Sequence, residues 1–217
     1  MLVAGSDGCS LTAHSYIQRS QESELDLPWL QGSYFSLLCE ELEIWSNNLP
    51  ANYAFVERYM YTFRVSRHLD IFLMIHAYYH QCCIALFGAF VPGKAHSRLG
   101  GLVTSIPPEF IQDCSDRCVA HARDISFLIK KVLKVDPEHL FRDPWFGPCI
   151  WDSTTALLAS LQWQDNSFYR EEVADLVKVN LQAIKNTMKI MRLAERIVCR
   201  NMTLDNLGIR IFNPSSR

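Results

Sequence analysis

The amino-acid sequence predicts an all-α fold, a multi-helix array around a long apolar central helix. Residues 71–90 read IFLMIHAYYHQCCIALFGAF, without an Asp, Glu, Lys or Arg, so a helix formed by them is apolar around most of its circumference. Much of the remaining chain repeats apolar residues at the helical spacings of three and four, and only residues 208–212 hint at a short strand. Because only a surrounding layer can bury such a helix, we expect the 71–90 segment at the centre of the fold.

The same segment is long enough to cross a bilayer, which is the alternative to a buried core helix. His76, His80 and Gln81 lie near its centre, and each of these side chains is costly in hydrocarbon. Basic residues flank the segment on both sides, so no positive-inside asymmetry indicates an orientation. We therefore predict a core helix and no membrane contact.

Two helices are predicted in the first half of the chain. Residues 34–45 place apolar side chains on one stripe, and Pro50 ends this region because proline cannot continue a helix and restricts the residue before it. The long apolar helix is expected over residues 66–87. Gly88 and the Pro-Gly pair at 92–93 follow it as stop signals.

Two more helices are predicted in the middle of the chain. A long one is expected to begin at Pro107 and Pro108, because the first turn of a helix tolerates the missing N–H, and to end before Pro137. A shorter helix follows over residues 150–163. The long helix has one packing face, formed by residues at three-four spacing: Ile111, Cys114, Cys118, Ala122, Ile125, Ile129 and Val132.

A last helix is predicted over residues 168–200, which contain neither Gly nor Pro. At 1.5 Å per residue it would extend about 45–50 Å. Its apolar residues fall near heptad spacing, so it is either a bundle helix with one buried face or a dimerising helix. In the second case the chain is a homodimer, and the oligomer seam consists of Val177, Leu181, Ile184, Met188 and Met191.

The composition fits one helical domain. The chain has 217 residues, of which 49% are hydrophobic and 20% charged, which is far from the disordered class. Its net charge of −2 provides no overall cationic field to attract nucleic acid. We divide it into a flexible N-terminal segment (1–27), without the features of a signal peptide, a helical domain (28–204) and a C-terminal tail (205–217).

The eight cysteines do not form the spacing pattern of a disulfide scaffold or of a zinc cluster. Cys82 and Cys83 are adjacent, most of the others are widely dispersed, and no Cys-x-x-Cys pair occurs. We expect a reducing compartment, in which free cysteines behave as small buried hydrophobes.

Two residue pairs resemble halves of a metal site. His76 and His80 are four residues apart on one helical face, as are Cys114 and Cys118. A zinc site needs further ligands, and packing or a hydrogen bond explains each pair without a metal. The sequence also contains no nucleophile elbow, phosphate-binding loop or dinucleotide fingerprint. We therefore predict no metal or other cofactor in this chain, no catalytic residues and no enzymatic activity.

Aromatic and imidazole side chains gather in two segments, the apolar helix and the connection at 144–151. Such a mixture lines small-molecule pockets, although the same residues can simply fill a core. The candidate pocket or core comprises His76, Tyr78, Tyr79, His80, Trp145, Phe146 and Trp151.

Three motifs in order resemble a known family. They are PWLQGSYFSLLCEELEIWSNNLP at 28–50, the apolar helix with its His-x-x-x-His followed by FVPG at 90–93, and PPEFIQDCSDRCVAHARDISFLI at 107–129. In this order they resemble the middle homology region of fungal zinc-cluster transcription factors, over about residues 28–165. The family often has Arg-Pro after the apolar helix, where this chain has Gly88 and Ala89.

The resemblance implies a nuclear regulatory domain that acts through protein–protein contacts or signal sensing. Its partners would be the transcription machinery or co-regulators. It would reach DNA only through a separate zinc-cluster reader, which would carry the zinc and would lie upstream in a full-length factor. Two alternatives remain: a helical protein-interaction module without a transcriptional role, and an unrecognised helical enzyme.

Overall fold

The computed structural model describes residues 27–91, 106–136, 146–163 and 166–188. Within these ranges the chain is helical and contains no strand, so the predicted all-α fold is confirmed. The predicted tail and nearly all of the predicted N-terminal segment lie outside them. The described elements are α2 (Tyr34–Asn47), the 3₁₀ helix η1 (Ala51–Tyr53), α3 (Glu57–Val65), α4 (Leu69–Gly88), α5 (Pro108–Val135), α6 (Phe146–Ser160) and α7 (Ser167–Met188).

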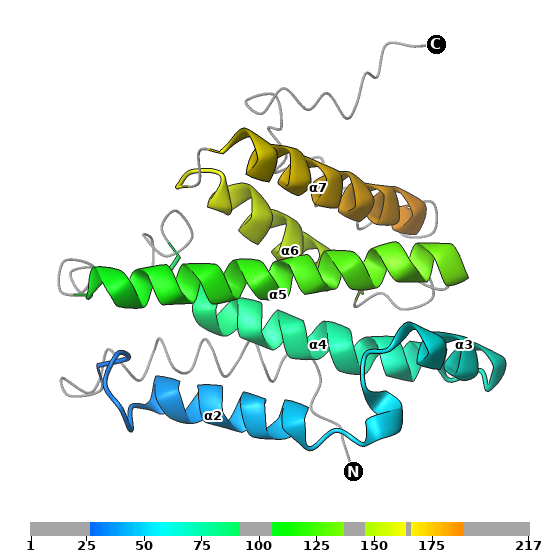
Figure 1. The fold of residues 1–217 in the computed structure, drawn as a ribbon, viewed down its shortest axis with the longest axis horizontal. Helices are drawn as coiled ribbons and strands as arrows, with labels where there is room; N and C mark the ends of the chain where they lie inside the picture. Colours follow the sequence, from blue (N-terminus) through cyan, green and yellow to red (C-terminus); the bar gives the residue numbers. More distant parts are fainter. Residues whose placement is uncertain (1–26, 92–105, 137–145, 164–165, 189–217) are drawn as a thin grey trace.

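The helices are stacked in layers, and the α4–α5 pair lies at the centre (Figure 1). α4 packs most extensively against α5 and also contacts α6, α2 and α3. α5 in turn contacts α6 and α7, which lie together on the other side of the pair. This arrangement gives the apolar α4 the surrounding layer that its sequence requires.

α2 begins at the predicted residue. Ser33 is its N-cap, and the Ser33 Oγ accepts a hydrogen bond from the Ser36 N–H at 3.1 Å. Gly32 before the cap has φ +80°, a left-handed conformation that glycine adopts without a steric penalty. The helix continues two residues beyond the predicted end, to Asn47.

α3 was not predicted, and α4 begins later than expected. α3 is only nine residues long and buries a single residue, Met60, so its periodic signal is weak. The predicted start of the apolar helix at residue 66 is wrong because the chain turns at Arg67, whose φ is 62°. α4 therefore begins at Leu69, after His68 as N-cap.

α4 contributes several large, completely buried side chains to the core. Leu69, Phe72 and Leu73 have no exposed surface. Half of the most apolar stretch of α4 is buried inside the fold. Within the described chain α4 is the helix long and apolar enough to cross a membrane. Core helices of soluble proteins share that length and composition, so the prediction of no membrane contact rests on its burial.

α5 and α6 follow the predicted pattern. α5 runs from Pro108 to Val135, and of its predicted packing face only Ile111 is not fully buried. α6 begins at Phe146, four residues earlier than predicted.

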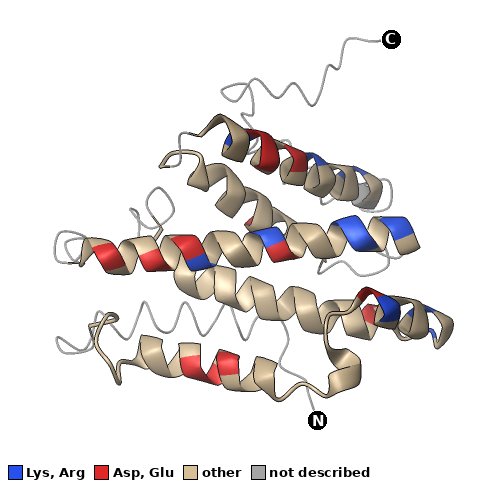
Figure 2. Ribbon diagram, in the orientation of Figure 1, with Lys and Arg blue, Asp and Glu red and all other residues tan. Residues whose placement is uncertain are grey.

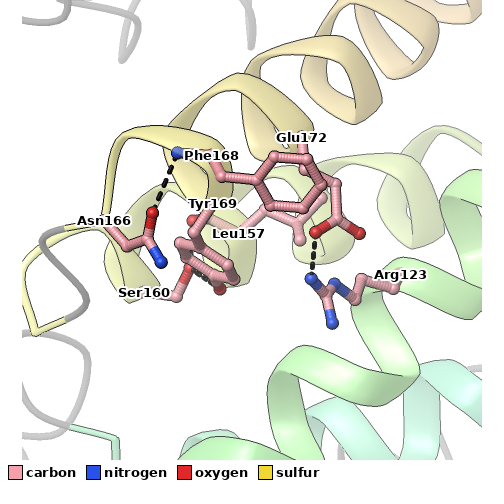
Figure 3. Close-up of polar contacts among 7 residues, drawn as sticks. All are labelled: Arg123, Leu157, Ser160, Asn166, Phe168, Tyr169 and Glu172. Atoms are coloured by element: carbon pink, nitrogen blue, oxygen red, sulfur yellow. Dashed lines mark hydrogen bonds and ion pairs between the residues drawn. The ribbon is translucent and has the colours of Figure 1, made fainter.

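α7 begins at a capped turn and packs on the rest of the fold (Figure 3). Asn166 precedes it, and its Oδ1 accepts a hydrogen bond from the Phe168 N–H at 2.9 Å. The Tyr169 hydroxyl donates to the Ser160 Oγ at 2.7 Å and so joins α7 to α6. Arg123 of α5 forms an ion pair with Glu172 of α7.

The predicted oligomer seam lies on α7 and beyond. Val177, Leu181 and Ile184 are at most 5% exposed and belong to the chain's own core. These three residues therefore form the buried face of a bundle helix, and they are not available for a seam between two copies. The side chain of Met188 and the whole of Met191 lie outside the described residues.

Charges are distributed unevenly over the helices (Figure 2). α2 carries three glutamates and no Lys or Arg. α5 is acidic near its start and basic at its end, where Lys130, Lys131 and Lys134 lie, as the helix dipole favours.

Candidate functional site

His76 and His80 share a helix but not a partner. The His76 Nε2–H donates to the Tyr53 carbonyl at 2.9 Å, and the ring packs against both Phe55 and Phe72. Burial lowers the pKa of His76, although the bond to Tyr53 partly opposes that shift. His76 is therefore a satisfied core histidine, which is the predicted packing role.

His80 instead meets a histidine of the facing helix. The Nδ1 atoms of His80 on α4 and His121 on α5 lie 3.0 Å apart, so one of them donates a hydrogen bond and the other accepts it. Asp124, one turn after His121 on α5, places its Oδ2 3.7 Å from the His80 Nδ1. The three ligand atoms all lie within 4.8 Å of one another.

Burial determines the charge state of this cluster. It lowers the pKa of His80 to about 3 and that of His121 to about 4, with further lowering of the first by His121 and of the second by Arg117. Partial desolvation also raises the pKa of Asp124, whose side chain remains 53% exposed. Both imidazoles are thus neutral at physiological pH, the form in which a ring nitrogen can accept a proton or bind a metal.

Aromatic side chains hold the two imidazoles in place. Phe87 stacks on His121 with ring centroids 5.9 Å apart and planes 2° apart. Tyr79 meets both His80 and His121 edge to face, and Trp45 of α2 stacks on Tyr79 with centroids 5.6 Å apart. The site therefore has ordered walls and one open side, because the Asp124 side chain is 53% exposed.

The candidate pocket residues are distributed around this region. Phe146 is buried in the core, Trp151 and Tyr78 are half-buried, and Trp145 lies outside the described residues. α4 and α6 are in contact as expected. Hydrogen bonds between them are formed by Gln81, which is not one of the candidate pocket residues. Its amide donates to the Asp152 Oδ2 at 3.1 Å and accepts from the Cys149 Sγ at 3.1 Å.

The sequence reasoning missed His121 and Asp124. The only local signal was their spacing of three residues, which places both on one face of a helix. Arg123 pairs with Glu172 and Arg117 pairs with Glu43 at 2.8 Å, and all four side chains keep part of their surface exposed. The guanidinium of Arg117 lies over the Phe87 ring and that of Arg123 over the Tyr169 ring.

Most described cysteines behave as buried thiols. Cys114 and Cys118 are buried thiols outside any disulfide, and burial raises the pKa of the Cys83 thiol to about 12. Cys118 donates a weak hydrogen bond from its Sγ to the Ile84 carbonyl at 3.8 Å. Cys82 is the exception, because it is disulfide-bonded, and the expectation of free thiols is wrong there.

No family model, curated protein or solved structure matches this chain. The described residues thus define an all-α protein with a His–His–Asp cluster at its central helix pair. The likeness to the fungal regulatory region rests on the sequence motifs alone.

Proposed function

We propose that this chain is a helical regulatory domain that works through protein–protein contacts, in the nucleus and in the control of transcription. The observation that supports this most directly is the outer face of α2. This helix exposes apolar and acidic side chains together, a combination that suits docking of a basic, amphipathic segment of a partner.

Two aliphatic side chains form the apolar part of this face. Leu37 is 48% exposed and Ile44 is 59% exposed, and they lie seven residues apart, so they share one side of the helix. The opposite side is fixed to the core through the buried Phe35, which meets Phe87, Phe90 and other rings edge to face. α2 is thus held firmly on one side and leaves the other available.

Carboxylates surround the exposed apolar residues. Glu40 and Glu41 lie between Leu37 and Ile44 and are exposed, and no Lys or Arg of α2 neutralises them. Such a face attracts a cationic partner electrostatically, while the two aliphatic side chains provide area to bury. Because the carboxylates of Glu40 and Glu41 lie beside the exposed aliphatic side chains of α2, we expect the partner to be a helix with Lys or Arg flanking its own apolar stripe.

The assignment to transcription comes from the sequence motifs. α2 lies within the segment 28–50 that resembles the fungal regulatory region, and the transcription machinery or a co-regulator is the partner that this resemblance implies. DNA contact is assigned to a separate zinc-cluster reader, since the chain has a net charge of −2.

The test is a reporter assay with the full chain fused to a heterologous DNA-binding domain. We expect the fusion to change reporter output, and the double variant Leu37→Ser, Ile44→Ser to remove most of that change. The matched control is Val65→Ser, Ile71→Ser, which removes two exposed aliphatic side chains from α3 and α4. A fusion that leaves the reporter unaffected, or a control that loses as much output as the α2 variant, contradicts the proposal.

The second candidate is an interaction module without a transcriptional role, and the same α2 face supports it. A basic amphipathic peptide would then bind the chain, with weaker binding to the α2 variant, while the reporter fusion stays silent. The pair of assays therefore separates the two functions.

A further inference from the structure

We propose that His80, His121 and Asp124 bind a divalent transition metal, zinc in the first place, between α4 and α5. This goes beyond the regulatory function and is independent of it. The metal would be ligated by the Nδ1 atoms of both histidines and a carboxylate oxygen of Asp124, with water as the fourth ligand.

The distances fit a tetrahedral ion. Zinc binds imidazole nitrogen and carboxylate oxygen at about 2.0–2.2 Å, so two ligand atoms of a tetrahedral site lie about 3.3–3.5 Å apart. The two Nδ1 atoms are 3.0 Å apart, and the His80 Nδ1 and Asp124 Oδ2 are 3.7 Å apart. All three ligand atoms lie within 4.8 Å of one another. The two imidazoles therefore need shifts of a few tenths of an ångström, and the exposed Asp124 carboxylate has to move by up to about 1.5 Å to complete the ligand set.

The ligands come from rigid elements. His121 and Asp124 lie three residues apart on the same face of the long helix α5, and His80 faces them from α4. Phe87 and Tyr79 fix the orientation of the rings. Such packing holds the side chains that would coordinate the metal close to the geometry that binding requires.

The proton balance of binding is simple. In the metal-free cluster one imidazole carries its proton on Nδ1 and donates it to the other ring, whose Nδ1 presents a lone pair. Binding requires lone pairs on both Nδ1 atoms, so the donor ring moves its proton to Nε2 through solvent. No histidine proton is lost overall, and the ion gives up hydration water in exchange for the three protein ligands.

The surrounding charges permit a cation. Asp124 supplies a carboxylate, and its 53% exposure leaves an entry path and room for the fourth ligand. The positive charge of Arg117 lowers the pKa of His121, and the Arg117 guanidinium is itself paired with Glu43 at 2.8 Å. The prediction of a metal-free chain considered only the pairs His76/His80 and Cys114/Cys118, which do not include these ligands.

The test uses the full chain, purified without a metal-affinity tag and stripped with a chelator. It is titrated with Co²⁺, whose visible absorption reports tetrahedral coordination, and zinc is then added in competition. We expect one ion per chain. At a hundredfold excess of zinc over its Kd, the melting temperature should rise by about 5–10 °C.

Two ligand variants and two matched controls decide the assignment. His121→Gln and Asp124→Asn should each weaken binding by at least about 100-fold, because loss of a second-shell partner alone typically costs roughly 10–100-fold. His68→Gln and Asp116→Asn, which change an exposed histidine and an exposed aspartate elsewhere, should stay within about twofold of the wild type. Circular dichroism checks folding, and Asp124→Asn keeps the test valid if His121→Gln unfolds.

Three outcomes overturn the proposal. The first is a wild-type chain that binds no saturable equivalent of Co²⁺ or zinc. The second is tight binding that survives in both ligand variants, which places the ion elsewhere. The third is an equal loss of binding in the ligand variants and the controls.

Discussion

Asn180 of α7 donates a hydrogen bond from its Nδ2 to the Ser153 Oγ of α6 at 3.1 Å, with both side chains completely buried. The same Nδ2 reaches the Thr154 Oγ1 at 3.1 Å. Ser153 in turn donates to the Ala122 carbonyl of α5 at 2.7 Å and lies 3.1 Å from the Ser126 Oγ. A polar network thus joins three helices inside the core, where each bond is costly to break.

We expect Asn180→Ala to lower the free energy of unfolding by about 2–3 kcal/mol. The change removes two buried hydrogen bonds, each worth about 1 kcal/mol, and leaves a small cavity. Urea denaturation followed by circular dichroism measures the effect. Gln182→Ala, on the exposed side of the same helix, serves as control and should stay within about 0.5 kcal/mol of the wild type. An Asn180 variant as stable as that control would show that the network contributes no net stability.

Tyr79 provides a test of core against pocket. It links α2 to α4 by stacking on Trp45, with planes 19° apart. We expect Tyr79→Ala to destabilise the fold by about 2–4 kcal/mol, as large-to-small changes in packed sites do. A double-mutant cycle with Trp45→Ala should give a coupling of about 0.5–1.5 kcal/mol. A Tyr79→Ala chain that melts like the wild type but changes reporter output would instead indicate a ligand pocket.

Periodicity was sufficient to predict the helices that form the core. α4 is apolar on nearly all sides, and α5 repeats Cys114, Cys118, Ala122, Ile125 and Ile129 on one face, so burial followed from the sequence. α3 escaped prediction because a nine-residue helix with one fully buried side chain has little periodic signal. Its single fully buried side chain, Met60, anchors it in the core.

The candidate site was beyond the reach of sequence reasoning for a different reason. His80 and His121 are separated by 41 residues, and spacing along the chain does not show which faces of two helices meet. The sequence therefore paired His80 with His76, its neighbour on the same helix. Asn180 and Ser153 are a similar case. In the sequence each polar residue only interrupts the apolar face of its helix, and the hydrogen bond that joins them is seen only in the folded chain.

We predict that the purified chain stays in the aqueous phase when Triton X-114 is warmed past its cloud point. α4 buries Phe72, Leu73 and Ile84 within the protein, and of its large aliphatic side chains only Ile71, at 48%, is exposed. Phase separation followed by gel electrophoresis measures the partition. Recovery of folded protein mainly in the detergent phase would contradict the assignment of α4 as a core helix.

The metal-free protein should lose stability as the pH falls below about 6.5. The pKa of His80 is lowered to about 3 and that of His121 to about 4, and the pKa of His76 is lowered as well, each mainly by burial. Well above pH 6.5, from about pH 8, these imidazoles are neutral in both the folded and the unfolded chain. Below it the unfolded chain binds protons that the folded chain does not, so the free energy of unfolding falls by up to about 1.4 kcal/mol per pH unit for each imidazole.

His76→Gln isolates one of these contributions outside the metal site. The glutamine amide keeps a donor for the Tyr53 carbonyl, which His76 contacts at 2.9 Å, and it does not titrate. Urea denaturation with chelator present measures the free energy of unfolding between pH 5 and 6.5. Its slope against pH should be shallower for the variant than for the wild type, by up to about 1.4 kcal/mol per pH unit. Between pH 8 and 9 the two proteins should have the same slope, because His76 is neutral in both states there. An unchanged slope at acid pH would mean that His76 is protonated equally in the folded and unfolded chain, and that burial does not hold it neutral.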